Sequence, residues 1–503
     1  MSQPPEGQIR VDDYVKGELS RDTNWWGAFV VGLAGTILVT GITGPTLAGL
    51  GGAAIPNFIF WTLTGWLLCL FIAELAAMLP DRTGGAPAYA YYAFKDRLPR
   101  AYPHINGLTN WMYWIGWMPV MAVNMLLTGA YVPVLFGFTD KTHTIQLFSN
   151  SVPVSYFTLL VGAGLSLLLF IPAFLGIRFG TGFATVLGLL SMIPLTVLAV
   201  APFFTGHFHG SNIESFHLAA AAGGGGFFGK HAFFLYLQFS ALLTWNVIAM
   251  EAAGCYIGEC KNPETDAPRA MNLEGGYGVF IYTVLPLAVL GVLGVKFVTA
   301  HAADINGILA GYARQTLNFA GVDKIITAAL LLALLLSSLN AIMGCARSLY
   351  MMSLDGQAPR IFGHVNRHNV PDFSMFLNVI MNILLLLAGT PGAIYVLSNV
   401  GYVGSFVPVL LGYYFLRKWR PEIHRPYKLP EFMKYVAFGL AILYFVVWAI
   451  GIPACAIKGC QAGGGKMFLI GLILVLCYFP LYWWRQAEDR RHGTTDYKVP
   501  TNA

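Results

Sequence analysis

The stretch "GTILVTGITGPTLAGLGG", residues 35–52, lies inside an apolar segment that begins at Trp25 and is typical of a membrane helix. It contains six glycines, one proline and four threonines. Inside a helix, a glycine costs about 1 kcal/mol relative to alanine and a proline about 3 kcal/mol. So many helix breakers in one apolar span predict that the helix is interrupted. A kink in an otherwise ordinary helix is the alternative interpretation.

The composition of the whole chain indicates a membrane protein. Of its 503 residues, 56% are hydrophobic and 11% are charged, and the mean hydropathy is +0.62. Soluble domains carry about 25% charged residues, and a helix that crosses a bilayer needs about 20 apolar residues. Because the apolar runs are long and do not alternate, they predict helices and not strands. The twelve predicted spans are 25–50, 58–79, 108–136, 154–175, 183–205, 231–258, 273–298, 326–353, 372–388, 393–416, 433–455 and 465–485.

The distribution of Lys and Arg predicts the orientation in a cytoplasmic (inner) membrane. Residues 1–24 are polar and do not resemble a cleaved signal peptide, so we expect a cytoplasmic N-tail at 1–24 and a cytoplasmic C-tail at 486–503. With twelve spans, 23 of the 30 Lys and Arg residues then face the cytoplasm, as the positive-inside rule requires. The outer seven are Lys141, Lys230, Lys296, Arg314, Lys324, Lys458 and Lys466. The net charge of +6 mostly reflects this rule, and we expect no nucleic-acid partner.

Seven cysteines are scattered along the chain. Cys455 and Cys460 flank a short outer loop, where an oxidising compartment permits a disulfide. Two unrelated thiols are the alternative. The spacing of the cysteines matches no zinc site.

The spans predict two halves of five helices each. The first half covers 25–205, an outer Gly-rich loop covers 206–230, and the second half covers 231–416. Two further helices lie within 433–485. Transporters built from inverted repeats interrupt corresponding helices of the two halves and bind their substrate between them near the membrane midplane. The helix that corresponds to the interrupted first span is the sixth.

The sixth span contains "TWNVIAMEAAG", residues 244–254, which places Glu251 far from both ends of the span. It is the only carboxylate in such a position among the predicted spans. An ionisable group at membrane depth is costly and therefore marks a functional site by default. A structural residue, hydrogen-bonded to neighbouring helices, is the alternative interpretation for Glu251.

Three motifs resemble the amino acid–polyamine–organocation (APC) superfamily of transporters, in its amino acid permease type. They are "IAELAAMLPDRTGGAPAYAYYAF" at 72–94, "GECKNPETDAPRA" at 258–270 and "CARSLYMMSLDGQAPRIFGHVNRHNVP" at 345–371. Their order and separation also match the family. The resemblance implies an all-α membrane protein of twelve helices with a leucine-transporter-like five-plus-five inverted repeat. It further implies that helices 1 and 6 are discontinuous and that two extra helices follow at the C-terminus.

The resemblance also implies where a substrate binds. Backbone N–H groups at the start of a half-helix take the substrate carboxylate, and free carbonyls take its amine. The family usually has Gly-Ser/Thr-Gly at the first break, where this chain has Val39, Thr40 and Gly41, and it has glycine where this chain has Ala249. We expect Gly44 and Pro45 to move the unwinding a few residues later along the chain. The expected substrate-binding residues are Val39, Thr40, Gly41, Ile42, Asn124, Trp245, Asn246, Ile248, Ala249 and Asn340.

Each polar residue of this set has a second interpretation as a hydrogen-bonding contact between helices. The same holds for Ser398 and Asn399 in the tenth span. Trp245 resembles the aromatic gate that the family places over its substrate, and a packing aromatic is the alternative.

Two kinds of coupling remain open from the sequence. Some relatives carry a lysine in the fifth span, where this chain has Ser191. Sodium-coupled members of the wider fold use carbonyls of span 1 and a hydroxyl pair of span 8, and this resemblance implies a sodium site at Gly35, Leu38, Ser337 and Ser338. Oxygen ligands suit such a cation, although such serines often bond to their own helix. Proton coupling or exchange through Glu251 is preferred, since burial disfavours a charged carboxyl group.

The sequence therefore predicts a secondary active transporter of an amino acid or a related small amine, working by alternating access. The alternatives are a sodium-coupled symporter of an atypical amino-acid-like substrate, a channel, and a membrane scaffold that does not transport. We expect no enzymatic activity and no cofactor other than a coupling proton or sodium ion. The expected partners are the small-molecule substrate and the lipid bilayer, with the protein as a monomer or a homodimer.

Overall fold

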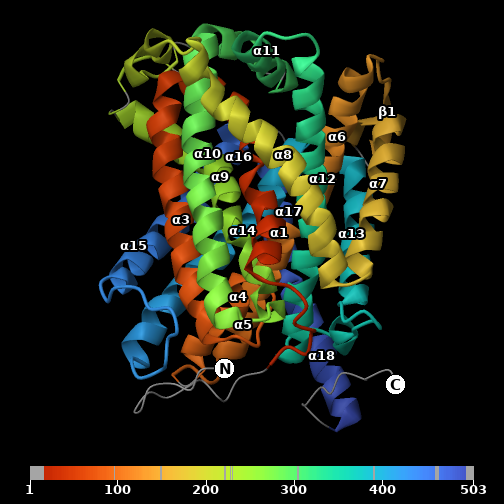
Figure 1. The fold of residues 1–503 in the computed structure, drawn as a ribbon. Helices are drawn as coiled ribbons and strands as arrows, with labels where there is room; N and C mark the ends of the chain where they lie inside the picture. Colours follow the sequence, from red (N-terminus) through yellow and green to blue (C-terminus); the bar gives the residue numbers. More distant parts are fainter. Residues whose placement is uncertain are drawn as a thin grey trace.

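The computed structural model describes residues 16–95, 97–147, 150–219, 223–226, 228, 230–302, 305–388, 391–458 and 464–493. Most helices run roughly parallel and form one bundle (Figure 1). Helix α11 lies at one end of the bundle, and helix α18 lies at the opposite end (Figure 1). A core of buried apolar side chains runs through the helices.

The first part of the chain contains α1 Trp25–Thr36, α2 Val39–Leu50, η1 Gly51–Ala53, α3 Ala54–Met78, α4 Ala86–Ala90, η2 Tyr91–Phe94, α5 Tyr102–Trp117, α6 Val120–Phe136, β1 Thr142–Leu147, β2 Asn150–Ser155, α7 Tyr156–Phe174, α8 Ile177–Thr205 and η3 Gly210–Phe216. The second part contains α9 Lys230–Ile248, η5 Ala249–Glu259, α10 Pro263–Ala300, α11 Ile305–Leu317, α12 Val322–Leu354, η6 Arg360–Gly363, α13 Asp372–Leu385, η7 Leu386–Ala388, α14 Pro391–Trp419, α15 Met433–Val446, η8 Val447–Gly451, α16 Ile452–Lys458, α17 Gly464–Leu476 and α18 Tyr478–His492.

Ten helical segments among the described residues are long and apolar enough to cross a membrane. The sequence predicts twelve, and two features account for the difference. The first two predicted spans form one helical run, Trp25–Met78, because η1 follows α2 directly and leads into α3 with no intervening loop. The ninth predicted span is α13, which has 14 residues and is shorter than a full crossing.

The first span is broken, but earlier than predicted. Helix α1 ends at Thr36 and α2 begins at Val39, so the break falls on Ile37 and Leu38. Gly44 and Pro45 lie within α2 and do not move the break later, which corrects that expectation. Neither residue at the break is a helix breaker, so local propensity does not decide its position.

Several glycines of the opening stretch serve close packing instead. A Cβ on Gly35 would lie 2.4 Å from the carbonyl oxygen of Ala249, and one on Gly49 would lie 2.1 Å from the ring of Phe239. Gly51 has a positive φ of 62°, the backbone conformation that favours glycine, and it begins the turn into η1 and α3. The glycines therefore allow neighbouring segments to touch and the chain to reverse.

The sixth span is also irregular. Helix α9 ends at Ile248, and the tighter 3₁₀ helix η5 continues from Ala249 to Glu259. A 3₁₀ helix of this length is uncommon and marks a hinge or a strained sequence. Every residue of η5 is buried, because α1, α3 and α10 pack around it.

One local feature differs from the sequence prediction. β1 and β2 form an antiparallel hairpin before α7, which the apolar pattern did not predict.

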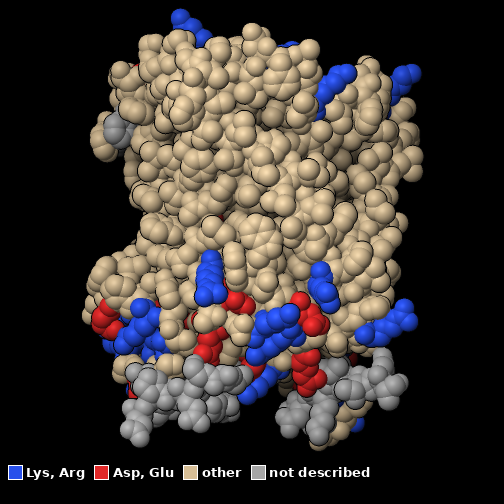
Figure 2. Space-filling model, in the orientation of Figure 1, with Lys and Arg blue, Asp and Glu red and all other residues tan. Residues whose placement is uncertain are grey.

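Charged residues gather at the end of the molecule where α18 lies, and a wide band without charged residues follows above it (Figure 2). The band fits a lipid-facing surface.

Candidate functional site

The two broken spans meet in the centre of the bundle. Gly35 in α1 lies against Ala249 at the start of η5, and Gly32 lies so close to η5 that a Cβ there would be 2.6 Å from the backbone nitrogen of Ala253. Gly32 and Gly35 are three residues apart and therefore share one face of α1. This face brings the α1 half of span 1 into direct contact with the η5 half of span 6.

Open space adjoins the first turn of α2. Gly41 is partly exposed, and a Cβ built on it would have no atom within 4 Å. Pro45 follows four residues later and has no N–H to donate to the carbonyl of Gly41. The N-cap residue Leu38 supplies no side-chain cap, but its carbonyl accepts from the Gly41 N–H at 3.0 Å. The start of α2 therefore offers the Gly41 carbonyl as an acceptor beside an open space.

Glu251 is fully buried in η5 and joins three elements. Its Oε1 accepts hydrogen bonds from the Tyr113 hydroxyl in α5 at 2.6 Å and from the Tyr402 hydroxyl in α14 at 3.4 Å. The Tyr113 hydroxyl also lies 3.2 Å from the Cys255 sulfur. Glu251 Oε2 has no hydrogen-bond partner of normal geometry. The acid therefore connects span 6 to spans 3 and 10 through hydrogen bonds of Oε1, while Oε2 makes none.

Aromatic rings surround this carboxyl group. The ring centroids of Tyr113 and Tyr402 are 5.8 Å apart, and those of Trp117 and Tyr402 are 5.7 Å apart. Trp245 lies 6.5 Å from Tyr402. Aromatic faces attract cations, and a carboxylate beside them adds the opposite charge. The cluster can therefore receive an ammonium group or a proton.

Trp245 is held in place by a hydrogen-bond chain. Its Nε1 donates to Ser398 Oγ at 2.6 Å, and Ser398 Oγ donates to the Gly116 carbonyl at 2.6 Å. Its ring also packs edge-to-face on Tyr395 at 4.6 Å. Ser398 therefore serves as a contact between helices, which was one of its two sequence interpretations.

Each of the three predicted asparagines is buried and keeps one unpaired side-chain atom. Tyr256 in η5 donates to Asn340 Oδ1 in α12 at 2.5 Å, while Asn340 Nδ2 is unpaired. Asn246 donates to Leu242 of its own helix at 3.1 Å, and its Oδ1 is unpaired. The amide nitrogen of Asn124 in α6 is also unpaired. Buried polar atoms normally have partners, so these unpaired atoms are candidates for contact with a ligand or water.

The four predicted sodium ligands lie in segments that pack together, because α1 contacts α12. Three of the groups already have partners, including the Leu38 carbonyl, which accepts from the Gly41 N–H at 3.0 Å. The Gly35 carbonyl accepts from the Tyr282 hydroxyl at 3.3 Å, and Ser338 Oγ donates to Leu334 of its own helix at 2.9 Å. Ser337 Oγ is buried without a partner.

Sequence reasoning missed Glu274, a second fully buried carboxylic acid. The predicted span began at residue 273, which put this acid at the end of a helix, whereas α10 begins at Pro263. The statement that Glu251 is the only acid far from a span end is therefore wrong. The motif "NPETDAPRA" before it indicates that the helix begins about ten residues earlier, since proline is typical of the first position of a helix.

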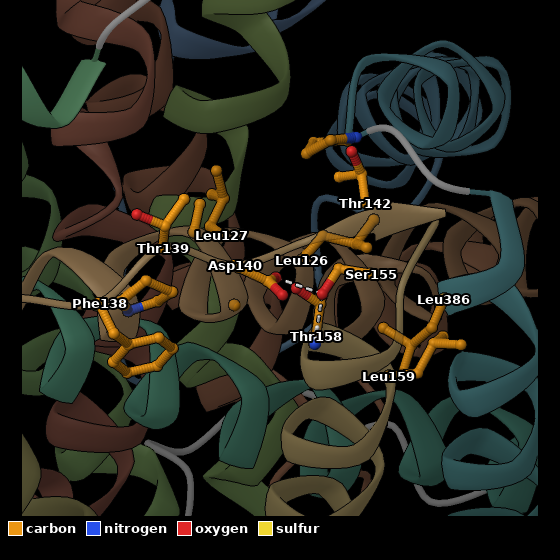
Figure 3. A pocket seen from close by; sticks show the side chains of 14 residues that line it. Leu126, Leu127, Phe138, Thr139, Asp140, Thr142, Ser155, Thr158, Leu159 and Leu386 are labelled. Atoms are coloured by element: carbon orange, nitrogen blue, oxygen red, sulfur yellow. Dashed lines mark hydrogen bonds between the residues drawn. The ribbon is translucent and has the colours of Figure 1, made fainter. Parts of the chain in front are cut away.

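The larger cavities lie away from this centre. One of about 510 Å³ opens between α6 and α7 near the hairpin (Figure 3). Its acid, Asp140, accepts from Ser155 Oγ, and Ser155 caps α7 through the Thr158 N–H at 3.0 Å (Figure 3). Asp140 therefore has a structural role. Cys455 is disulfide-bonded, whereas Cys460, its predicted partner, lies outside the described residues.

Comparisons with known proteins agree with the resemblance of the motifs. Residues 24–478 match the amino acid permease family. The amino acid permease YvbW of Bacillus subtilis is 23% identical over 420 residues, 81% of this chain and 87% of that protein. The branched-chain amino acid permease BcaP of Lactococcus lactis is 25% identical over 244 residues, 48% of this chain and 49% of that protein. The D-serine/D-alanine/glycine transporter of Escherichia coli K12 is 22% identical over 432 residues, 83% and 84% of the two chains.

The family match covers most of the chain, including both broken spans and the three motifs. The relatives are named as permeases and transporters, which fits the helices long enough to cross a membrane. The chain belongs to the amino acid permease family and is a multi-pass membrane transporter of amino acids.

Proposed function

We propose that this protein is a secondary active transporter that moves an amino acid or a related small amine by alternating access. It crosses the membrane twelve times, with two five-helix halves, two extra helices and both termini in the cytoplasm. The observation that carries the proposal is the contact of the two broken spans beside the open space at Gly41. Broken helices of this kind bind substrates at the membrane midplane.

The substrate carboxylate binds at the start of α2, where the positive end of the helix dipole favours an anion. The substrate amine binds near the Gly41 carbonyl, which Pro45 leaves without its helical donor. Val39, Ile42, Ile248 and Ala249 limit the size of the space. Asn124, Asn246 and Asn340 supply hydrogen bonds to the substrate or to the water around it.

Coupling is by protons or by exchange, with Glu251 as the group that binds a proton. Its bonds to Tyr113 and Tyr402 support a role in closing the inner side, because spans 3 and 10 must separate from span 6 to open it. The sodium-coupled alternative uses Ser337, whose hydroxyl is buried without a partner. A dependence of ligand stabilisation on sodium distinguishes the two.

A thermal-shift screen of the purified protein tests the binding function. Amino acids and amines are added one at a time, in sodium and in choline buffers. A ligand at 100 times its Kd stabilises the folded state by about 2.7 kcal/mol. If no compound raises the unfolding temperature, a scaffold without transport becomes the better interpretation.

Gly41→Ala tests the position of the site. The added methyl group meets no protein atom, and alanine is favoured over glycine in a helix by roughly 0.5–1 kcal/mol, so we expect a folded protein with weaker substrate binding. Gly164→Ala in α7 is the matched control, since a Cβ there also has no atom within 4 Å. Unchanged uptake and KM in Gly41→Ala would contradict the site.

A further inference from the structure

Glu274 lies at the contact between the inner halves of the two broken spans. Its Oε2 accepts a hydrogen bond from the backbone N–H of Ala253 in η5 at 3.1 Å. A Cβ on Gly32 of α1 would lie 2.5 Å from the same oxygen. A single carboxyl group of α10 therefore touches α1 and η5 together.

The other oxygen of Glu274 is unpaired. Oε1 is buried and has no hydrogen-bond partner. Glu251 from η5 acts electrostatically on this acid, and the acid acts on Cys255 of η5 and Cys69 of α3. Helix α1 has no titratable side chain, and among the described residues no cation acts on the acid.

These surroundings favour the neutral acid. A buried charge without a partner costs several kcal/mol, and the nearby Glu251 carboxyl adds repulsion when both groups are ionised. A proton on Oε1 removes both costs, and Oε2 still accepts from Ala253. If the side chain at 274 only accepted a hydrogen bond from the Ala253 N–H, a neutral amide would do so without the cost of burying an ionisable group.

We propose that Glu274 is a proton-binding residue that holds the inner halves of spans 1 and 6 together while it is protonated. When α1 and η5 separate, water reaches the carboxyl group, its O–H bond breaks, and the proton passes to cytoplasmic water. The hydrated carboxylate then favours the open arrangement, because reclosing would bury its charge. The inference rests on the proposed function, and it gives the transport cycle a proton site separate from Glu251.

The pH dependence of stability tests proton binding without any substrate. The full-length protein in detergent is unfolded by heat at several values between pH 6 and pH 9, as wild type, Glu274→Gln and Glu264→Gln. An acid held protonated in the folded state binds more protons there than in the unfolded state. Stability then falls as pH rises.

Glutamine keeps the acceptor for Ala253 and cannot ionise, so Glu274→Gln should remove roughly half or more of that fall in unfolding temperature. Glu264→Gln, in the first turn of the same helix, should retain it. An unchanged fall in Glu274→Gln overturns the proposal. So does failure of this variant to fold at pH 6, because its amide mimics the neutral acid.

Transport by proteoliposomes tests coupling. Uptake of a mixture of ¹⁴C-labelled amino acids is measured with and without an inward proton gradient. Wild type and Glu264→Gln should be accelerated by the gradient, and Glu274→Gln should be accelerated less, because one of the two proposed proton sites is removed. A full response in Glu274→Gln overturns the coupling role. If wild type transports none of the mixture, the proposed function fails, while the thermal result still decides whether Glu274 binds a proton.

Discussion

At the residue scale, the centre of the protein is built from acids and aromatic hydroxyls that hold helices together. Glu251 accepts from Tyr113 and Tyr402, and Glu274 accepts from Ala253. Each acid keeps one oxygen without a partner. Both carboxyl groups can therefore serve the structure and still bind a proton or a ligand.

Tyr113→Phe removes the shorter of the two hydrogen bonds to Glu251. We expect the folded protein to lose about 1–3 kcal/mol, since the acid remains buried with fewer donors. Thermal unfolding in detergent measures the loss. Tyr444→Phe is the control, because its hydroxyl makes only a neutral bond to Thr64 at 3.3 Å. Equal losses of stability in the two variants would show that the hydrogen bond to Glu251 stabilises the fold no more than the neutral bond to Thr64 does.

At the element scale, the breaks of spans 1 and 6 depend on contacts between segments. Helix α1 begins where expected, because Asn24 accepts from the Gly27 N–H at 3.1 Å and caps it. Its end at Thr36 has no comparable local signal. The break lies where α1 meets η5, and glycines make that contact possible.

Gly35→Ala should disturb this contact. The new methyl group would lie 2.4 Å from the Ala249 carbonyl oxygen, which is backbone and cannot rotate away. Overpacking of this kind costs about 1–3 kcal/mol, and we expect a lower unfolding temperature together with reduced uptake. Gly276→Ala in α10 is the control, since its Cβ position is open. A normal unfolding temperature in Gly35→Ala would mean that α1 and η5 do not pack as described.

At the scale of the whole molecule, ion pairs close the end that carries most of the charge (Figure 2). Arg82 pairs with Asp355 at 2.7 Å, Arg417 pairs with Glu74 at 2.6 Å, and Arg347 pairs with Glu259. Removing one partner of a buried pair is costly. These pairs therefore fasten segments that are distant in the sequence on the side predicted to face the cytoplasm.

Labelling of single cysteines tests that orientation. Lys324 and Arg100 are both exposed, at opposite ends of the bundle. In intact cells, a membrane-impermeant maleimide should label Lys324→Cys above the background of the unmodified chain and leave Arg100→Cys unlabelled until the cells are opened. The reverse pattern would invert the orientation.

The sequence alone determined the class of protein, the approximate position of most spans, the broken first and sixth helices and the family. These properties depend on residues close together in the chain, because hydropathy and motifs are sums and patterns over short segments. Glu251 stood out for the same reason, as a charge inside an apolar run.

Only the tertiary structure decided where span 1 breaks, how Trp245 is bound to Ser398, and that Glu274 is buried beside Gly32 and Ala253. Each depends on which distant segments touch, and close packing allows such contacts only where side chains are small enough. The glycines of residues 35–52 therefore predicted a break correctly. Their main physical role is to let the two broken helices and their neighbours approach one another.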